Sequence, residues 1–251
     1  MKKEKIAISI DNSLLSLIDS QIDNTTILSR SQAIEYLIKK SLKQQPLDTA
    51  IILIHKDHQN HLIKKFRNIP LIQHHLNFLI KNKIRIIYII TQKTDFIEDL
   101  IKQFPKKLNT IITDEKEPRG TASALSLLKN QLKTNFIVIN GDTFNDFNLQ
   151  KMFNEHLNSN KLVTMGLISS QTPHQRGSVI LDGNTVINFK EKQITKSNII
   201  NAGIYIIKPE IFNFYSKKTK SLEKDLFPLL ALKNQIQGFF TFGDFVHIPE
   251  N

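Results

Sequence analysis

The sequence predicts an α/β protein with a small strand–helix–helix unit at its N-terminus and a larger domain built on a mainly parallel sheet. Three observations predict this fold class. Residues 5–10 alternate polar and apolar side chains, and two segments of helical periodicity follow them. From Thr49 onward, apolar runs of strand length alternate with amphipathic segments of helix length. The polar segment Lys43–Asp48 contains a proline that ends the preceding helix, so we place the domain boundary between residues 1–45 and 46–251.

The N-terminal unit begins with a predicted strand from Lys5 to Ile10. Its isoleucines would share one face, and its other side chains the opposite face. A first helix is predicted around Leu14–Ile18, with Asp11–Ser13 offering capping side chains. A second helix is predicted around Ala33–Ile38, with either Ser29 or Ser31 as its cap.

This pattern resembles the ribbon-helix-helix repressors of the Arc and MetJ class over roughly residues 3–44. In that family the strands of two chains pair into a ribbon that enters the major groove. The resemblance therefore implies a homodimer that binds double-stranded DNA. It implies base contacts from one group of residues and a phosphate contact from another. The first group is Lys5, Ala7 and Ser9, and the second is Ser29, Arg30 and Ser31. A unit used only for dimerisation is the alternative.

The second domain begins with Ala50–Ile54, a near-continuous apolar run that is typical of a strand buried on both faces. Further strands are predicted at Ile84–Ile90, Thr110–Thr113, Phe136–Ile139, Leu162–Ile168, Gly177–Leu181, Val186–Phe189, Ile199–Ile207 and near Phe240–His247. Helices are predicted at Leu71–Leu79, Phe96–Phe104, Thr121–Leu132, Leu149–Leu157 and Leu222–Leu232. The alternation in the first half predicts parallel strands with a site at their carboxyl ends, and the second half is richer in strands.

Composition narrows the classes of function. The chain has 251 residues and no cysteine, which excludes disulfides, thiolate metal sites and a cysteine nucleophile. No apolar run reaches the roughly 18 residues of a membrane span, and the N-terminus lacks the apolar stretch of a signal peptide, so we expect a cytoplasmic protein without a membrane partner. The net charge of +11 favours an anionic partner. Residues 1–45 carry only about +2 of this charge.

Several blocks of the second domain resemble, in order and spacing, those of the sugar-nucleotide nucleotidyltransferases over about residues 50–249. The blocks are Glu117–Leu125, Val138–Asp142, Arg176-Gly177, Glu191-Lys192, Asn201–Tyr205 and Ser221–Asp225. The resemblance implies a Rossmann-like mixed, mainly parallel sheet. It also implies a Mg²⁺-dependent reaction in which a sugar 1-phosphate attacks the α-phosphate of a nucleotide and pyrophosphate leaves.

The resemblance also names candidate site residues. Contacts with a nucleotide or sugar are implied for Gly120, Thr121, Gly177, Glu191, Lys192 and Asn201. Asp142 is the candidate metal ligand, because a carboxylate at a strand's carboxyl end can hold Mg²⁺ between phosphate oxygens. His247 stands where the family has a second metal-binding Asp, although imidazole suits Zn²⁺ better than Mg²⁺. A strand-ending turn, a helix cap and a close-packed glycine are the plain structural alternatives for these blocks.

One block of the family is missing. After the first strand the family carries a glycine-rich phosphate loop with an Arg and a Pro-Lys pair, whereas this chain has His55–Phe66 without any glycine. Side chains there should prevent the same backbone cradle. His55, His58 and His61 follow one another at three-residue spacing, so either a metal site on a helical turn or a set of exposed polar residues is expected. The lost cations could be replaced by Lys56, Lys64, Lys65 or His61.

These observations predict a DNA-binding transcriptional regulator whose second domain is a weakened nucleotidyltransferase that senses a nucleotide or sugar nucleotide. The alternative is an active Mg²⁺-dependent sugar-1-phosphate nucleotidyltransferase with an autoregulatory DNA-binding arm. A third interpretation is a scaffold without a ligand. The sequence leaves open whether enzymatic activity remains.

Overall fold

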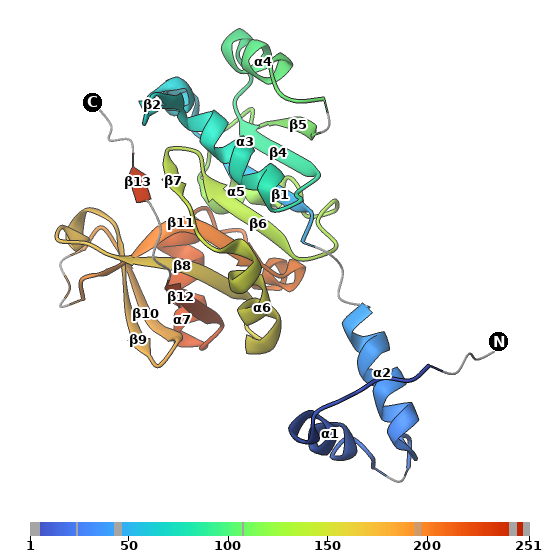
Figure 1. The fold of residues 1–251 in the computed structure, drawn as a ribbon. Helices are drawn as coiled ribbons and strands as arrows, with labels where there is room; N and C mark the ends of the chain where they lie inside the picture. The colour runs from blue at the N-terminus through green and yellow to red at the C-terminus, as the bar shows by residue number, and fades with distance from the viewer. Residues whose placement is uncertain are drawn as a thin grey trace. The chain divides into compact units, whose positions relative to one another are not determined.

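The computed structural model describes residues 6–23, 25–42, 47–106, 108–193, 195, 197–240 and 245–247. The chain divides into two compact units, Met1–Pro46 and Leu47–Asn251, whose elements are drawn in Figure 1. Among the helices within these ranges, none has the length and apolar character needed to cross a membrane.

The first unit contains two helices, α1 (Asn12–Asp19) and α2 (Arg30–Leu42). Asp11 caps α1, as predicted, because its carboxylate accepts a hydrogen bond from the Leu14 N–H at 2.9 Å. Ser29 rather than Ser31 caps α2, since the Ser29 hydroxyl accepts a hydrogen bond from the Gln32 N–H at 3.3 Å. Both helices are therefore confirmed where their periodicity and caps placed them.

The prediction of a strand from Lys5 to Ile10 is wrong for the residues that the structure describes. Residues 6–10 form no strand, and Lys5 lies outside the described residues. A strand needs a neighbour to pair its backbone groups, and the other described segments of this unit are helices and their connection. Ile6 and Ile8 are consequently 76% and 56% exposed. A ribbon-helix-helix fold is therefore not evident in this unit.

The second unit is built on a nine-stranded mixed sheet with the order β5-β4-β1-β6-β11-β8-β12-β10-β9. Its strands are β1 (Thr49–Leu53), β4 (Ile86–Thr91), β5 (Asn109–Asp114), β6 (Phe136–Asn140), β8 (Val163–Ser169), β9 (Gly177–Asp182), β10 (Thr185–Glu191), β11 (Ile199–Ile207) and β12 (Ile236–Phe240). The four strands from β5 to β6 run parallel, and β11 is antiparallel to both β6 and β8. The predicted α/β class with a mixed sheet is confirmed.

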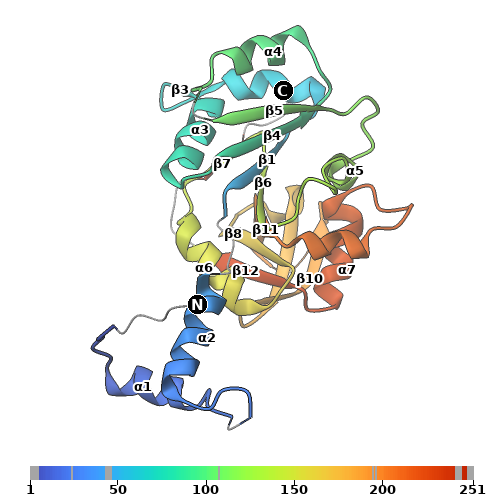
Figure 2. The ribbon, with the colours of Figure 1, turned by 90° about the vertical axis from the view of Figure 1, so that its right-hand side faces the viewer.

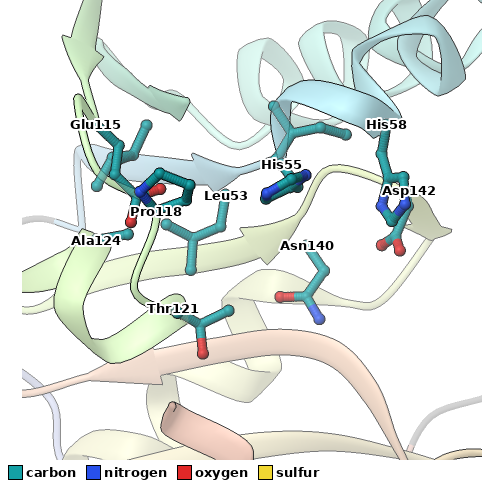
Figure 3. A pocket seen from close by; sticks show the side chains of 12 residues that line it. Leu53, His55, His58, Glu115, Pro118, Thr121, Ala124, Asn140 and Asp142 are labelled. Atoms are coloured by element: carbon teal, nitrogen blue, oxygen red, sulfur yellow. The ribbon is translucent and has the colours of Figure 1, made fainter. Parts of the chain in front are cut away.

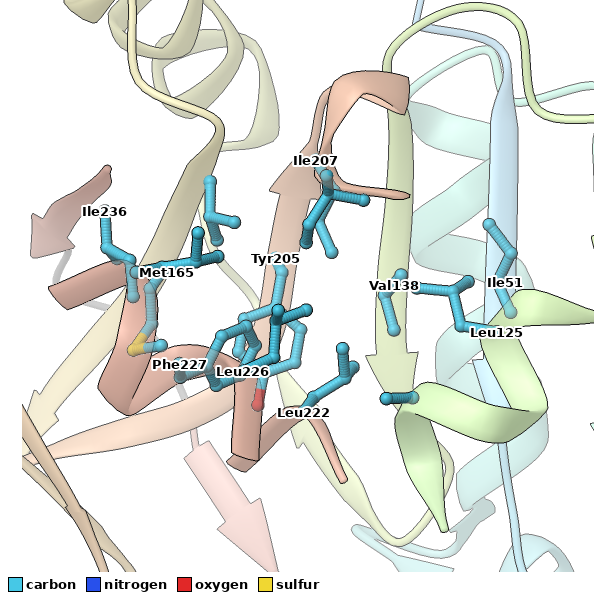
Figure 4. Packing of buried hydrophobic residues seen from close by; sticks show 14 of the residues in the cluster. Ile51, Leu125, Val138, Met165, Tyr205, Ile207, Leu222, Leu226, Phe227 and Ile236 are labelled. Atoms are coloured by element: carbon cyan, nitrogen blue, oxygen red, sulfur yellow. The ribbon is translucent and has the colours of Figure 1, made fainter. Parts of the chain in front are cut away.

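Helices cover both faces of this sheet. One layer contains α3 (Leu71–Lys81), α4 (Asp95–Lys102) and α6 (Leu149–Ser159), and the other contains α5 (Thr121–Ser126) and α7 (Phe227–Leu232). Figure 2 shows α3 and α6 on one side of the strands and α5 and α7 on the other. Successive residues of β1 point to opposite layers, so its apolar run is buried on both faces, as predicted. Figure 4 shows the packing on the α5 and α7 side.

Three elements differ from their predictions. The helix expected over Thr121–Leu132 ends at Ser126, because the next N–H groups bond three residues back, as from Leu127 to the Ala124 carbonyl at 3.1 Å. The helix expected over Leu222–Leu232 is present, but its first turn is the π-helical segment η4 (Leu222–Leu226). One last strand was predicted near Phe240–His247, and the structure has two strands there, β12 and β13 (Phe245–His247).

Short elements complete the second unit around the ends of the central strands. The 3₁₀ helix η1 (Lys56–Ile63) follows β1 and occupies the position of the missing glycine-rich loop. Two small antiparallel pairs join β2 (Lys65–Phe66) to β3 (Ile69–Pro70) and β7 (Thr143–Asn145) to β13. Figure 1 shows β13 beside β7, so the end of the described chain returns to the segment that follows β6.

Candidate functional site

Two pockets meet at the carboxyl ends of β1 and β6. The chain leaves β1 for β4 on one side and later returns to β6 on the other, and ligands of such sheets bind where the strand order reverses. The first pocket has a volume of about 200 Å³ and is shown in Figure 3. The second has a volume of about 570 Å³. Asn140 and Asp142 line both pockets and therefore form their shared wall.

Asp142 is held in this wall by the backbone. The Gly141 N–H donates to the Leu53 carbonyl at 2.8 Å, and a Cβ on Gly141 would lie 2.9 Å from Ile54, so the end of β6 packs directly on the end of β1. β13 then brings His247 opposite Thr143, and the His247 Nε2 lies 3.6 Å from Asp142 Oδ2. The structure thus brings together the two residues that the sequence named as candidate metal ligands.

The side chains of this shared wall can be compared with the ligands that Mg²⁺ prefers. Asp142 supplies a carboxylate, and the buried Oδ1 of Asn140 has no hydrogen-bond partner among the residues that the structure describes. Oxygen donors suit Mg²⁺, which is commonly held by one or two carboxylates together with substrate phosphates. Within the described part of the chain, no three His, Asp or Glu side chains are grouped to hold a metal ion. The residues therefore fit a Mg²⁺ ion that arrives with phosphates, and do not form an all-protein metal site.

The histidines of η1 form a packed row. The His58 and His61 rings stack with their centroids 5.1 Å apart, and the His55 ring lies 5.9 Å from that of His58. His55 Nδ1 accepts a hydrogen bond from the Asp57 N–H and so caps the helix. His61 is buried, and burial lowers the pKa of its imidazole. This row replaces the open backbone of a phosphate loop with side chains, as the missing glycines predict.

Gly120 and Thr121 form a junction rather than an open backbone cradle. Gly120 has φ +115°, and a Cβ there would lie 2.7 Å from the Lys220 carbonyl oxygen. That carbonyl accepts hydrogen bonds from the Ala122 and Ser123 N–H groups, so the first donors of α5 are already used. The Thr121 hydroxyl donates to Glu223 Oε2 at 2.7 Å and accepts from the Leu222 N–H at 2.9 Å. The first N–H groups of α5 are therefore paired within the chain, and the contact of Gly120 and Thr121 with a nucleotide or sugar stays a prediction.

Glu191 and Lys192 lie at the end of the β9–β10 hairpin. A Cβ on Gly177 would lie 2.7 Å from the Glu191 carboxylate, so the glycine lets this side chain cross into the second pocket. Glu223, which sequence reasoning did not single out, lines the same pocket. Burial and then the Glu223 carboxylate raise the pKa of Glu191. Lys192 is exposed at the rim, where its N–H donates to the Arg176 carbonyl at 3.1 Å.

Asn201 shapes the strand that floors the second pocket. Its Oδ1 accepts from the Gly203 N–H at 2.9 Å, and its Nδ2 donates to the Tyr205 hydroxyl at 2.5 Å. Gly203 has φ +71° within an irregular part of β11, where the pairing with β8 shifts. Asn201 lines the second pocket, its polar atoms bond to the Gly203 N–H and the Tyr205 hydroxyl, and its contact with a nucleotide or sugar stays a prediction.

Glu115 is a further residue that sequence reasoning missed. It follows β5 and lines the first pocket with Pro118 and His55 (Figure 3). Its Oε1 accepts a hydrogen bond from the Arg119 N–H at 3.3 Å, and burial raises its pKa. The signal available in the sequence was its place at the end of a predicted parallel strand, where polar side chains face the site.

The candidate DNA-contacting residues are spread over the first unit. Ala7, Ser9, Ser29 and Ser31 are exposed, and Lys5 lies outside the described residues. Arg30 is exposed but engaged, because its guanidinium donates two hydrogen bonds of 2.7 Å to the Asp19 carboxylate. A bidentate pair of this kind orients the guanidinium toward α1. Arg30 would have to leave Asp19 before it could hold a phosphate.

Comparison with known proteins assigns the second unit. A family model described as nucleotidyl transferase matches residues 51–245. The chain is 32% identical over 189 residues to mannose-1-phosphate guanyltransferase beta-B of Xenopus laevis, a match that covers 70% of this chain and 52% of that protein. It is 33% identical over 194 residues to the mannose-1-phosphate guanylyltransferase catalytic subunit beta of Drosophila melanogaster, covering 74% and 53%. This chain spans about half the length of these curated relatives.

Solved structures agree on the fold. A putative glucose-1-phosphate thymidylyltransferase from Bacillus anthracis has a TM-score of 0.69 at 20% identity, covering 79% of this chain and 89% of that one. HddC from Yersinia pseudotuberculosis has a TM-score of 0.67 at 24% identity, covering 80% and 93%. The family match begins at residue 51 and leaves the first unit unassigned.

Proposed function

The chain belongs to the nucleotidyl transferase family through residues 51–245, and from this membership we propose that its second unit transfers a nucleotidyl group to a sugar 1-phosphate. The sequence alone favoured a DNA-binding regulator over an active transferase. The proposal for the second unit reverses that preference. One observation carries the proposal. Asp142 and Asn140 form the wall between two pockets, so two substrates can meet at one pair of oxygen donors.

In the proposed reaction, a phosphate oxygen of the sugar 1-phosphate forms a bond to the α-phosphorus of a nucleoside triphosphate. The bond between the α- and β-phosphates breaks, and pyrophosphate leaves with the electron pair. Bound Mg²⁺ would neutralise charge on the phosphates, and Asp142 and Asn140 are the residues that would hold it. The protein's own contribution is to place the two substrates in line across the shared wall.

Glu115 favours guanine as the base. Guanine presents an N1–H and an exocyclic amino group on one edge, and a carboxylate can accept hydrogen bonds from both donors. Glu115 is the carboxylate that lines the first pocket away from the shared wall, beside Pro118. The proposed donor is therefore GTP, which agrees with the guanylyltransferase names of the relatives.

Glu191 and Glu223 favour a polyhydroxylated partner in the second pocket. Both carboxylates line it, and carboxylates accept hydrogen bonds from hydroxyl groups. The proposed acceptor is a hexose 1-phosphate, with mannose 1-phosphate as the first compound to try because of the relatives' printed names. The closed η1 helix predicts a turnover slower than that of a protein with an open phosphate loop.

The test is release of pyrophosphate from the full chain with Mg²⁺, across nucleoside triphosphates and hexose 1-phosphates. We expect the highest rate with GTP and a loss of at least about 100-fold in Asp142→Asn, because the variant removes the negative charge that would hold Mg²⁺. Asp182→Asn is the matched control, since Asp182 is exposed at the β9–β10 turn. Absence of pyrophosphate with every pair, or equal rates in the two variants, would contradict the proposal.

We further propose that the first unit pairs with a second copy of itself and binds double-stranded DNA. The observation in favour is the exposure of Ile6 and Ile8, which alternate along an extended segment and would be covered by strand pairing. A unit of this size does not bury a sufficient core alone. The test is a gel shift on the DNA upstream of the chain's own coding sequence. Equal affinity after deletion of residues 1–44 would refute DNA binding by this unit.

A further inference from the structure

Arg176 lines the second pocket, and its guanidinium makes no ion pair with any side chain that the structure describes. It lies between the 3₁₀ turn η2 (Pro173–Gln175) and β9, and its side chain lines the pocket. Among the described residues, no carboxylate lies within ion-pairing distance of its guanidinium, and no hydrogen bond satisfies it. The side chain is half-buried, and burial lowers its pKa. Partial burial of a charged guanidinium costs free energy unless an anion pairs with it.

The backbone and an aromatic ring hold Arg176 in place. Its N–H donates to the Pro173 carbonyl at 3.2 Å, and its carbonyl accepts from the Lys192 N–H at 3.1 Å. Its guanidinium carbon lies 5.0 Å from the centroid of the Phe245 ring, which is within the range of a cation–π contact. Phe245 belongs to β13, the strand that also carries His247 to Asp142. One short strand thus supports both Arg176 and the shared wall.

The surrounding charges indicate which part of a ligand Arg176 would meet. Asp142 attracts Arg176 from the shared wall. The carboxylates of Glu191 and Glu223 repel each other in the same pocket and suit hydroxyl groups rather than a phosphate. Arg176 and the exposed Lys192 are the Lys and Arg residues that line this pocket. An anionic group of the acceptor therefore fits beside Arg176 rather than beside the carboxylates of this pocket.

We propose that Arg176 binds the phosphate of the sugar 1-phosphate acceptor and orients its attacking oxygen toward the nucleotide. This inference rests on the proposed function for the identity of the acceptor. A planar guanidinium can donate two parallel hydrogen bonds to a phosphate, which fixes the direction of its third oxygen as well as its position. Arg176 would thereby supply a charge that the helix η1 does not offer through its backbone.

The experiment compares Arg176→Gln, Arg176→Lys and the control Arg85→Gln in the full chain. Arg85 is exposed just before β4, at the opposite end of the strands from the pockets. Steady-state kinetics with GTP and mannose 1-phosphate should show a KM for the sugar phosphate raised about tenfold or more in Arg176→Gln, with the KM for GTP changed less than about twofold. Arg176→Lys should raise this KM less than Arg176→Gln does, because lysine keeps the positive charge but cannot donate two parallel hydrogen bonds.

Binding separates this inference from the proposed function. Calorimetric titration with mannose 1-phosphate, glucose 1-phosphate and unphosphorylated mannose requires no turnover. If the wild-type chain binds a sugar phosphate and releases no pyrophosphate, and Arg176→Gln loses that binding, the proposed function fails and the role of Arg176 stands. The inference is overturned if Arg176→Gln binds and turns over like Arg85→Gln. It is equally overturned if the KM for GTP rises instead, or if the wild-type chain binds no sugar phosphate. Thermal melting of each variant checks that the fold is retained.

Discussion

Gly203 combines a positive φ with a close contact beside the second pocket. Its φ is +71°, and a Cβ would lie 2.8 Å from Thr143 Oγ1, whose hydroxyl donates to the Asn140 carbonyl at 3.0 Å. We expect Gly203→Ala to lower the free energy of unfolding by about 3 kcal/mol, from left-handed strain and the forced shift of Thr143 together. Urea denaturation measures this loss.

Gly183 provides the matched control for that substitution. It has φ +55° in the β9–β10 turn, and a Cβ there would meet nothing within 4 Å. Gly183→Ala should therefore cost only the backbone strain, about 1 kcal/mol. Equal losses in the two variants would contradict the view that the contact with Thr143, rather than the positive φ alone, requires glycine at position 203.

His156 makes the stability of the second unit depend on pH. The ring is fully buried in α6, its Nδ1 lies 2.8 Å from the Thr164 hydroxyl, and burial lowers its pKa to about 3. The unfolded chain then binds more protons than the native state below the ordinary histidine pKa of about 6.5. Stability is therefore lost as pH falls through 6.5 toward 3. We expect His156 to account for a loss of about 2 kcal/mol between pH 7.5 and pH 5.

Urea denaturation across that pH range provides the measurement. His156→Gln should be less stable at pH 7.5 and should lose less stability on acidification than the wild type. His174→Gln is the control, because His174 is an exposed imidazole. Buried His75, whose pKa burial lowers to about 4, keeps part of the dependence in both variants. A slope in His156→Gln equal to that of the wild type would show that the charge on this ring does not matter.

The junction between α5 and η4 connects the two pockets, because Thr121 lines the first and Glu223 lines the second. Thr121 ties the two together through Glu223 and the Leu222 N–H. We expect Thr121→Val to lower the free energy of unfolding by about 2 kcal/mol, since it leaves a partly buried carboxylate and N–H with fewer partners. It should also raise the KM for the sugar phosphate, because Glu223 loses a donor that orients it. Thr121→Ser keeps the hydroxyl and should retain both properties.

Elements with strong periodicity and a local cap were predictable, and contacts between distant segments were not. The alternating burial of β1 and the caps at Asp11 and Ser29 follow from local sequence, so they are found where expected. The start of α5 contacts the Lys220 carbonyl, about 100 residues away, and no local pattern reveals a contact over that separation. A single strand such as residues 5–10 cannot be judged from its own pattern, because pairing needs a partner.

The residues of the candidate site were also only partly predictable from the sequence. Gly120, Gly177 and Asp142 were named from blocks of sequence, and they lie at the two pockets. Glu115 was not named, and Arg176 and Glu223 were named only within blocks, because the sheet order brings these side chains to the pockets. The pairing of β13 with β7 places Phe245 and His247, and no local pattern in three residues reveals it.

At the scale of the whole molecule, the proposed chemistry and the proposed pairing of two chains belong to different units. The residues proposed for nucleotidyl transfer, from His55 to His247, all lie in the unit Leu47–Asn251. Exposed Ile6 and Ile8 lie in the unit Met1–Pro46. Removal of the first unit should therefore change the oligomeric state and leave the turnover of the second intact.

This separation gives the last prediction. A chain of residues 47–251 should release pyrophosphate within about twofold of the full-length rate and sediment as a monomer, whereas the full chain should sediment as a dimer. Ile8→Lys in the full chain tests the same surface without a truncation, because a charge on the paired face opposes association. Ile180→Lys is its control, since Ile180 is 43% exposed on β9 of the second unit. A dimer that survives both the deletion and Ile8→Lys would place the interface on the second unit instead, and loss of turnover in residues 47–251 would mean that the first unit takes part in the chemistry.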